Sequence, residues 1–232
     1  MKKSIIFIAV ILGLAIGFSF TGCDNGVINS SQDTTLVCLG NSLTAGYGAT
    51  APWTDDKSNS YPAYLQDKIN IPVVNAGVSG NTTSQGLSRI NRDVLSKNPR
   101  IVIIELGAND LFQRIPITDI RDNLQNIINK LNNGNRKIYL AKFYTDKIAR
   151  TMANGIGITN YILQTAFITR YNNMFNTLSS SNNVVLIEDI WDGVWGIHMS
   201  DSIHPNAAGY KIMANNYFKI LQPYLQANGL LK

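Results

Sequence analysis

Five short apolar runs recur along the chain, each bounded by small or polar residues. They are rich in Leu, Ile and Val and show little alternation of apolar and polar positions, which is typical of strands buried on both faces of a parallel sheet. The runs cover residues 36–40, 73–77, 101–107, 137–143 and 184–190. This pattern predicts five parallel strands.

Segments with helical periodicity separate these runs. Apolar residues are spaced by three and four in 83–96 and in 118–131, where Thr118 is a candidate N-cap. Further helices are expected at about 158–178 and, after Pro205, at 206–225. Strands that alternate with helices indicate an α/β fold, a three-layer α/β/α sandwich around a central five-stranded parallel sheet. One domain, 34–232, accounts for the whole pattern.

The stretch 144–157 is less regular and follows the fourth predicted strand. It therefore belongs to the carboxyl edge of the sheet, where open α/β folds bind ligands. A lid or pocket wall and a solvated crossover loop are both compatible with this position.

The first residues predict export. Lys2 and Lys3 precede an apolar run, 5–20, that is too short for a typical membrane span and is followed by Thr21, Gly22 and Cys23. The pattern resembles a bacterial lipoprotein signal peptide, 1–22, with Cys23 as the lipidated residue and 23–33 as a tether. A plain N-terminal membrane anchor and ordinary cleavage are the alternatives. We expect an extracytoplasmic lipoprotein, periplasmic or at the cell surface, held to a membrane by its N-terminal lipid.

Composition narrows the function classes. Of 232 residues, 45% are apolar and 15% charged, which excludes disordered, coiled-coil and collagen-like chains. The formal charge of +5 is spread thinly and includes no basic cluster, so we expect no nucleic-acid partner. Cys38 lies in an apolar run and is expected to be a small buried side chain, not a nucleophile.

Residues with catalytic potential follow the predicted strands. Ser42 comes directly after the first strand, where a hydroxyl serves either as a helix N-cap or as an exposed nucleophile. Gly77 ends the second predicted strand and Gly80 follows it, Asn109 follows the third, and a histidine, His204, precedes the last helix. Serine needs a base within hydrogen-bond reach, and histidine is the usual one.

Four segments together resemble the SGNH hydrolase superfamily, also called GDSL esterases. They are LGNSLTAGY (39–47), VVNAGVSGNTTSQGL (73–87), ELGAND (105–110) and DSIHPN (201–206), in the order and at the strand ends where the family has its motifs. The similarity is greatest to the bacterial thioesterase, lysophospholipase and arylesterase branch. It covers roughly residues 34 to 226 and implies a flavodoxin-like SGNH hydrolase fold.

The resemblance implies a role for each matching residue. Ser42 corresponds to the nucleophile, His204 to the base and Asp201 to the acid that orients the base. The oxyanion hole corresponds to the backbone N–H groups of Ser42 and Gly80 and to the side-chain amide of Asn109.

One residue departs from the family pattern. Asn41 occupies the place before the nucleophile, where the family usually has Asp. Its amide oxygen can still accept the turn's hydrogen bonds, but without a charge. We expect an active site despite this change.

Other candidates have simpler interpretations. We expect Asp110 to be a structural acceptor, His198 to lie at the surface or the pocket rim, and Trp191 and Trp195 to pack in the core, with an acyl-pocket wall as the alternative. Two histidines and scattered carboxylates offer no metal site, so no metal or cofactor is expected.

The sequence thus predicts a serine esterase that is monomeric by default. Its expected substrates are short or medium acyl esters, aryl esters, lysophospholipids or acyl thioesters. The alternatives are a carbohydrate O-acetylesterase of the cell envelope and a binding lipoprotein that has lost its chemistry. The acyl-chain length is open.

Overall fold

The computed structural model describes residues 35–51, 54–143 and 158–232, which belong to the compact unit 31–232. The predicted signal peptide, Cys23, the tether and the possible lid at 144–157 lie outside the described residues. No described helix combines the length and the apolar character that a bilayer span requires.

A five-stranded parallel sheet with the order β2-β1-β3-β4-β5 forms the centre of the described domain. Its strands are β1 (Thr35–Gly40), β2 (Val73–Gly77), β3 (Pro99–Glu105), β4 (Lys137–Ala141) and β5 (Val185–Ile187). Each lies within or close to a predicted apolar run, so the predicted sheet and its parallel character are confirmed. The central strands are almost fully buried because helices cover both faces.

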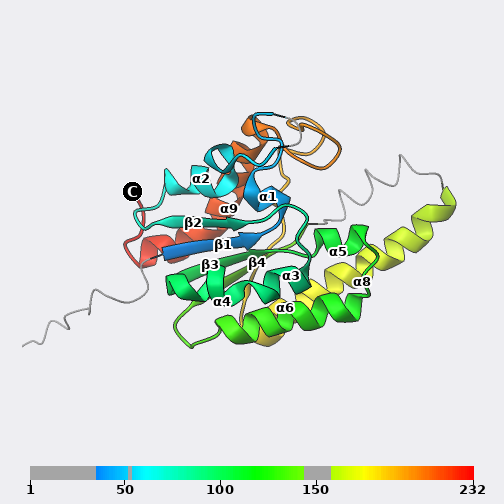
Figure 1. Cartoon of the computed structure of the whole chain (residues 1–232), viewed down its shortest axis with the longest axis horizontal. Helices are drawn as coiled ribbons and strands as arrows, with labels where there is room; N and C mark the ends of the chain where they lie inside the picture. Colours follow the sequence, from blue (N-terminus) through cyan, green and yellow to red (C-terminus); the bar gives the residue numbers. More distant parts are fainter. Residues whose placement is uncertain (1–34, 52–53, 144–157) are drawn as a thin grey trace, which may run out of the picture. The chain divides into compact units, whose positions relative to one another are not determined.

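Helices form the two outer layers (Figure 1). One face of the sheet carries α2 (Tyr61–Gln66) and α9 (Ala207–Ala227), and the other carries α3 (Thr83–Ser88), α4 (Ile90–Asp93), α6 (Ile117–Leu131) and α8 (Ile158–Asn182). Two short helices, α1 (Ser42–Ala45) and α5 (Ala108–Phe112), directly follow β1 and β3. Two 3₁₀ turns, Lys57–Asn59 and Leu95–Lys97, complete the described elements. The three-layer α/β/α prediction is therefore confirmed.

The helices agree with the sequence-based prediction at one end and differ from it in two places. Asn206 caps α9 through its side-chain oxygen, which accepts the N–H of Gly209 at 3.0 Å. The predicted Thr118 cap is wrong, because α6 begins at Ile117 and Pro116 occupies the N-cap position. The proline ring fixes the backbone angle φ where the chain enters the helix. The predicted helix 83–96 is also interrupted, because the backbone leaves helical geometry at Arg89 and the second part, α4, ends at Asp93 before a 3₁₀ turn.

The strand order determines where ligands can bind. The chain passes from β1 outward to β2 and then returns past β1 to β3, so the direction of winding reverses at β1. In open α/β sheets, binding sites form at the carboxyl ends of the strands beside such a reversal. Ser42 and Asn109 stand at those strand ends, on α1 and α5.

Candidate active site

Asn41 caps α1 and leaves Ser42 as the first residue of this helix. The side-chain oxygen of Asn41 accepts the backbone N–H of Leu43 at 3.0 Å. The N-cap interpretation of Ser42 is therefore wrong, because Asn41 is the cap. The hydroxyl of Ser42 is free for other contacts, and its own N–H occupies a helix position that has no intrahelical acceptor.

Asp201 and His204 belong to a tight loop before α9. Met199 and Pro205 form an antiparallel bridge across its base, and the N–H of Ser200 donates to the carbonyl of His204 at 2.8 Å. Within the loop, Oδ1 of Asp201 accepts the backbone N–H groups of Ile203 at 2.8 Å and of His204 at 2.7 Å. One carboxylate oxygen thus holds the turn and leaves Oδ2 for the imidazole.

The structure brings Ser42, His204 and Asp201 together. Nε2 of His204 lies 2.9 Å from Oγ of Ser42, and Nδ1 lies 2.7 Å from Oδ2 of Asp201. Burial alone would raise the pKa of Asp201, but hydrogen bonds from the Ile203 backbone and from His204 outweigh it and keep this pKa below its ordinary value. An ionised Asp201 favours the His204 tautomer that carries its proton on Nδ1 and presents Nε2 to the hydroxyl.

The two candidate oxyanion glycines have different surroundings. Gly80 is exposed and has φ +80°, and a Cβ built there would meet nothing within 4 Å. Gly77 is buried, and a Cβ there would lie 2.3 Å from the backbone nitrogen of Ala45. Gly77 thus serves the close approach of β2 and α1, whereas open space faces Gly80.

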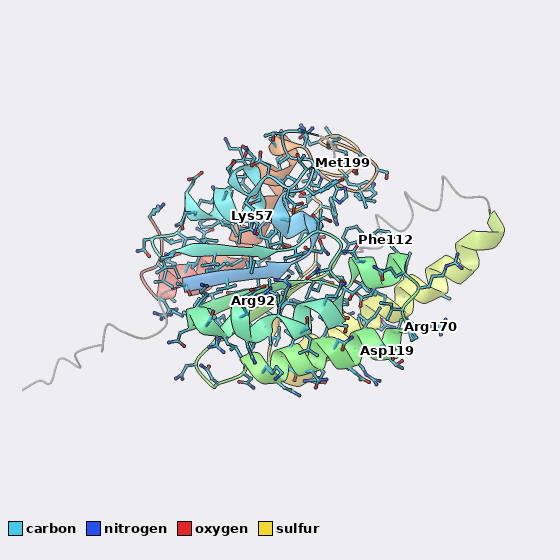
Figure 2. All side chains as sticks on the ribbon, in the orientation of Figure 1. Lys57, Arg92, Phe112, Asp119, Arg170 and Met199 are labelled. Atoms are coloured by element: carbon cyan, nitrogen blue, oxygen red, sulfur yellow. The ribbon has the colours of Figure 1, made fainter. Side chains whose placement is uncertain are left out.

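Asn109 is tied to the loop that carries Gly80. Nδ2 of Asn109 donates to the backbone oxygen of Asn81 at 3.0 Å. The amide nitrogen carries two hydrogens, so one remains after this bond is made. Met199, on the loop of the histidine, and Phe112, on the helix of Asn109, both lie at the end of the molecule where the strands terminate (Figure 2).

A buried carboxyl group, that of Glu105, lies beneath the turn that carries Ser42. Its oxygens accept hydrogen bonds from Nδ2 of Asn41 at 3.2 Å and from Oγ1 of Thr44 at 3.1 Å. Burial raises the pKa of Glu105 to about 8, against the opposing effect of these donors. Glu105 was not predicted as a site residue, although a single charged side chain at the end of an apolar run was its signal in the sequence.

Tyr47 is a second residue that sequence reasoning missed. Its ring packs against the imidazole of His204, with ring centroids 4.6 Å apart and planes tilted by 50°. Its backbone oxygen accepts the hydroxyl of Tyr210 at 2.9 Å, which joins α9 to the turn after Ser42. Its position in the segment 39–47, which also contains Ser42, was the sequence feature that pointed to Tyr47.

The remaining candidates take the structural positions that we expected. Asp110 is fully buried and accepts the N–H of Thr83 at 2.9 Å. Trp191 lies in the core, donates from Nε1 to the backbone oxygen of Phe143 at 2.7 Å, and packs edge-on against a partly buried Trp195. His198 is half-buried.

Two further features concern possible ligands. Cys38 is buried, and this burial raises the pKa of its thiol, so it behaves as an apolar side chain. Among the described residues, no cluster of three or more His, Cys, Asp or Glu side chains could hold a metal ion.

Comparison with known sequences identifies the family. The sequence profile of the GDSL-like Lipase/Acylhydrolase family matches residues 38–212. The chain belongs to this family. Its activity class is therefore the hydrolysis of carboxylic esters, and its substrates are small-molecule esters.

Relatives of this GDSL-family hydrolase include enzymes of several ester specificities. The Thioesterase 1/protease 1/lysophospholipase L1 of Escherichia coli K12 is 30% identical over 82% of this chain and 84% of its own length. Esterase TesA of Pseudomonas aeruginosa is 26% identical over 82% of this chain and 89% of its own. The psychrotrophic esterase EstA from Pseudoalteromonas, solved with monoethylphosphonate, shares the fold with a TM-score of 0.67 and 22% identity, over 84% of this chain and all of EstA.

Proposed function

We propose that this GDSL-family hydrolase cleaves carboxylic esters through an acyl-enzyme formed on Ser42. The observation that supports this most directly is the continuous hydrogen-bonded chain from Ser42 through His204 to Asp201, with links of 2.9 and 2.7 Å. Such an arrangement lets the imidazole accept the hydroxyl proton as Oγ attacks the carbonyl carbon. The proton then passes to the departing alcohol, and a water activated by the same imidazole releases the acid.

The oxyanion hole consists of the N–H groups of Ser42 and Gly80 and the Nδ2 group of Asn109. Three considerations support this assignment: the unpaired helix position of the Ser42 N–H, the open space at Gly80, and the tie between Asn109 and the residue after Gly80. Donors held in place before the reaction stabilise the tetrahedral intermediate without reorganisation. Removal of one such donor costs about 100- to 1000-fold in turnover.

Short or medium acyl esters and aryl esters are the proposed substrates, with lysophospholipids and acyl thioesters as further members of the class. The name of the Escherichia coli relative, which includes thioesterase and lysophospholipase, supports this choice. No organic cofactor and no metal take part in the proposed steps, because the serine, the imidazole and water supply every group that reacts.

Hydrolysis of p-nitrophenyl acetate, butyrate, octanoate and palmitate by the purified full chain tests the proposal, with Ser42→Ala as the matched variant. We expect a rate of hydrolysis that depends on the length of the acyl chain and that Ser42→Ala abolishes. We also expect a fluorophosphonate to label Ser42 covalently. Unchanged hydrolysis by Ser42→Ala would refute the acyl-serine mechanism. If the folded protein cleaves acetylated sugars but none of these esters, the substrate class is the cell-envelope O-acetyl group instead.

We also propose that the protein is a lipid-anchored, extracytoplasmic monomer. The support lies in the residues of the N-terminus: Lys2 and Lys3, a short apolar run, and Gly22 before Cys23. Metabolic labelling of the full chain with a radioactive fatty acid in a bacterial host tests the anchor, with Cys23→Ser as the control. Label that persists in Cys23→Ser would overturn the proposal, and sedimentation of the detergent-solubilised protein tests the monomer.

A further inference from the structure

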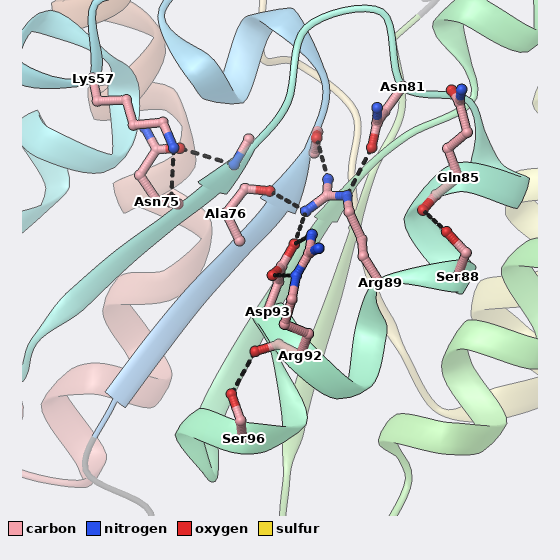
Figure 3. Close-up of polar contacts among 12 residues, drawn as sticks. Lys57, Asn75, Ala76, Asn81, Gln85, Ser88, Arg89, Arg92, Asp93 and Ser96 are labelled. Carbon is pink, nitrogen blue, oxygen red and sulfur yellow. Dashed lines mark hydrogen bonds and ion pairs between the residues drawn. The ribbon is translucent and has the colours of Figure 1, made fainter.

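Arg89 is a buried arginine whose guanidinium donates to two backbone carbonyls and to one side-chain amide oxygen. Its side chain is 7% exposed and stands between α3 and α4. Nη2 donates to the carbonyl of Gly40 at 2.8 Å, Nη1 donates to the carbonyl of Ala76 at 2.7 Å, and Nε donates to Oδ1 of Asn81 at 2.7 Å (Figure 3). Asp93 neutralises the group through a 3.0 Å ion pair with Nη1.

These acceptors lie beside the proposed oxyanion donors. Gly40 ends β1 two positions before Ser42, and Asn81 directly follows Gly80. The backbone oxygen of Asn81 also accepts Nδ2 of Asn109. The guanidinium therefore bonds to a residue two positions before Ser42 and to the residue directly after Gly80. Asn81 in turn accepts the bond from Asn109.

Hydrogen bonds that involve Gly40 and Arg89 hold both ends of the loop between β2 and α3. Val78 donates its N–H to the carbonyl of Gly40 at 3.1 Å, and Arg89 donates to the side chain of Asn81. Gly80 lies between these two contacts, in a turn that the N–H of Asn81 closes on the carbonyl of Val78 at 3.2 Å, and a Cβ at Gly80 would meet no atom within 4 Å. The position of its N–H therefore depends on this turn and on the contacts that hold Val78 and Asn81.

We propose that Arg89 is a positioning residue for the oxyanion hole, through its bonds to Gly40 and Asn81. This inference rests on the proposed acyl-serine mechanism. A guanidinium suits the task because its donors form a rigid planar fork, whereas an ammonium group is a point charge on a flexible stem. Burial of an ion pair is weak evidence for stability, since apolar replacements are often equally stable, so the geometry that it imposes is the better explanation.

The expected effect lies in turnover and not in substrate binding. The oxyanion donors act on charge that exists only in the transition state, so their displacement lowers kcat and leaves KM nearly unchanged. A displacement of about 1 Å at a reacting group costs about 100-fold in rate. We therefore expect Arg89→Met to lower kcat for p-nitrophenyl butyrate by about 100-fold, with KM within about twofold of the wild type.

Arg92→Met is the matched control. Arg92 is a neighbour of Arg89 in the sequence, also pairs with Asp93, and has a side chain that is 76% exposed. This variant should keep the wild-type kcat and KM. The number of active sites in each preparation is taken from the final amplitude of fluorophosphonate labelling, so that a smaller folded fraction is not read as slower turnover.

Two further variants test the proposal if Arg89→Met folds poorly. Arg89→Lys keeps the charge but loses the fork, and should lower kcat per labelled site at least about tenfold. Asn81→Ala removes the side-chain acceptor but keeps the backbone oxygen that holds Asn109. If Arg89 acts through Asn81, the loss caused by Arg89→Lys is smaller in the Asn81→Ala background than in the wild type.

Three results would overturn the inference: a kcat per labelled site within about threefold of the wild type in both Arg89 variants, a change confined to KM, or an effect of Arg89→Lys that is fully independent of Asn81→Ala. Failure of the underlying mechanism has a different signature. In that case Ser42→Ala keeps the activity and no fluorophosphonate label appears on Ser42, whatever the Arg89 variants do.

Discussion

Nδ2 of Asn41 donates a hydrogen bond to Oε1 of Glu105 at 3.2 Å, inside the core and directly beneath the proposed nucleophile. The family usually has aspartate at position 41, so this chain presents an uncharged donor where a second carboxyl group would stand. The same glutamate accepts a bond from Thr44, so it contacts residues on both sides of Ser42. Asn41 therefore avoids a pair of adjacent buried carboxyl groups in this turn.

Asn41→Asp is expected to reduce stability more at high pH than at low pH. Below about pH 8 the folded wild type keeps a proton on Glu105, and the folded variant keeps one proton on the pair because two adjacent buried carboxyl groups cannot both ionise, so the deficit in the free energy of unfolding should be nearly constant there. Above pH 8 the wild-type glutamate ionises whereas the pair still holds its proton, so the deficit should grow by at most about 1.4 kcal/mol per pH unit. Urea unfolding of both proteins at about pH 7 and about pH 9.5 measures this growth. Equal deficits at both pH values would contradict this account.

Glu105→Gln should remove a pH dependence from the wild-type protein. Glu105 has a pKa of about 8 when folded, against an ordinary value of 4.5, so the folded state holds a proton that the unfolded state loses across this range. The wild-type free energy of unfolding should fall relative to Glu105→Gln as the pH rises from 4.5 to 8, by at most about 1.4 kcal/mol per pH unit. Urea unfolding at several pH values in this window measures the difference in slope. Asp119→Asn, an exposed carboxylate on α6, is the control and should follow the wild type.

Asp201→Asn should lower kcat by about 1000- to 10,000-fold while the fold persists. The amide carries no charge to stabilise the imidazolium, and its N–H group can face Nδ1 of His204, which then favours the wrong tautomer. Initial rates with p-nitrophenyl butyrate measure the loss, and far-UV circular dichroism checks the fold. A loss below about tenfold would show that the 2.7 Å contact between Asp201 and His204 does not serve catalysis.

Gly77→Ala and Gly80→Ala should separate stability from activity. At Gly77 the new methyl group meets the Ala45 nitrogen at 2.3 Å, so the protein should lose at least about 3 kcal/mol of stability. At Gly80 the methyl group enters open space, and the cost of φ +80° is only about 1 to 2 kcal/mol. Activity should fall sharply in Gly80→Ala, because the methyl group occupies the approach to the proposed oxyanion donor. Thermal unfolding and ester hydrolysis of both variants provide the comparison, and full activity in Gly80→Ala would exclude Gly80 from the oxyanion hole.

The sequence by itself determined the strands and the motif residues that follow them. Apolar runs located all five strands, because strands buried on both faces must be apolar throughout. The start of the last helix was also predicted, at residue 206, where the structure has Asn206 as the N-cap of α9. The break of the predicted helix at Arg89 could not be predicted from the sequence, because the acceptors of its guanidinium, Gly40 and Ala76, are distant in the sequence.

Only the tertiary structure decided which of these residues meet. Hydrophobic periodicity records that a segment is buried but not which segment lies beside it, and the strand order places β1 between β2 and β3. That order brings Glu105, at the end of β3, beneath Asn41, and it sets the ends of β1 and β2 within reach of one guanidinium. The motifs thus named the residues of the proposed catalytic chain, whereas the packing of the sheet selected the buried groups that hold them.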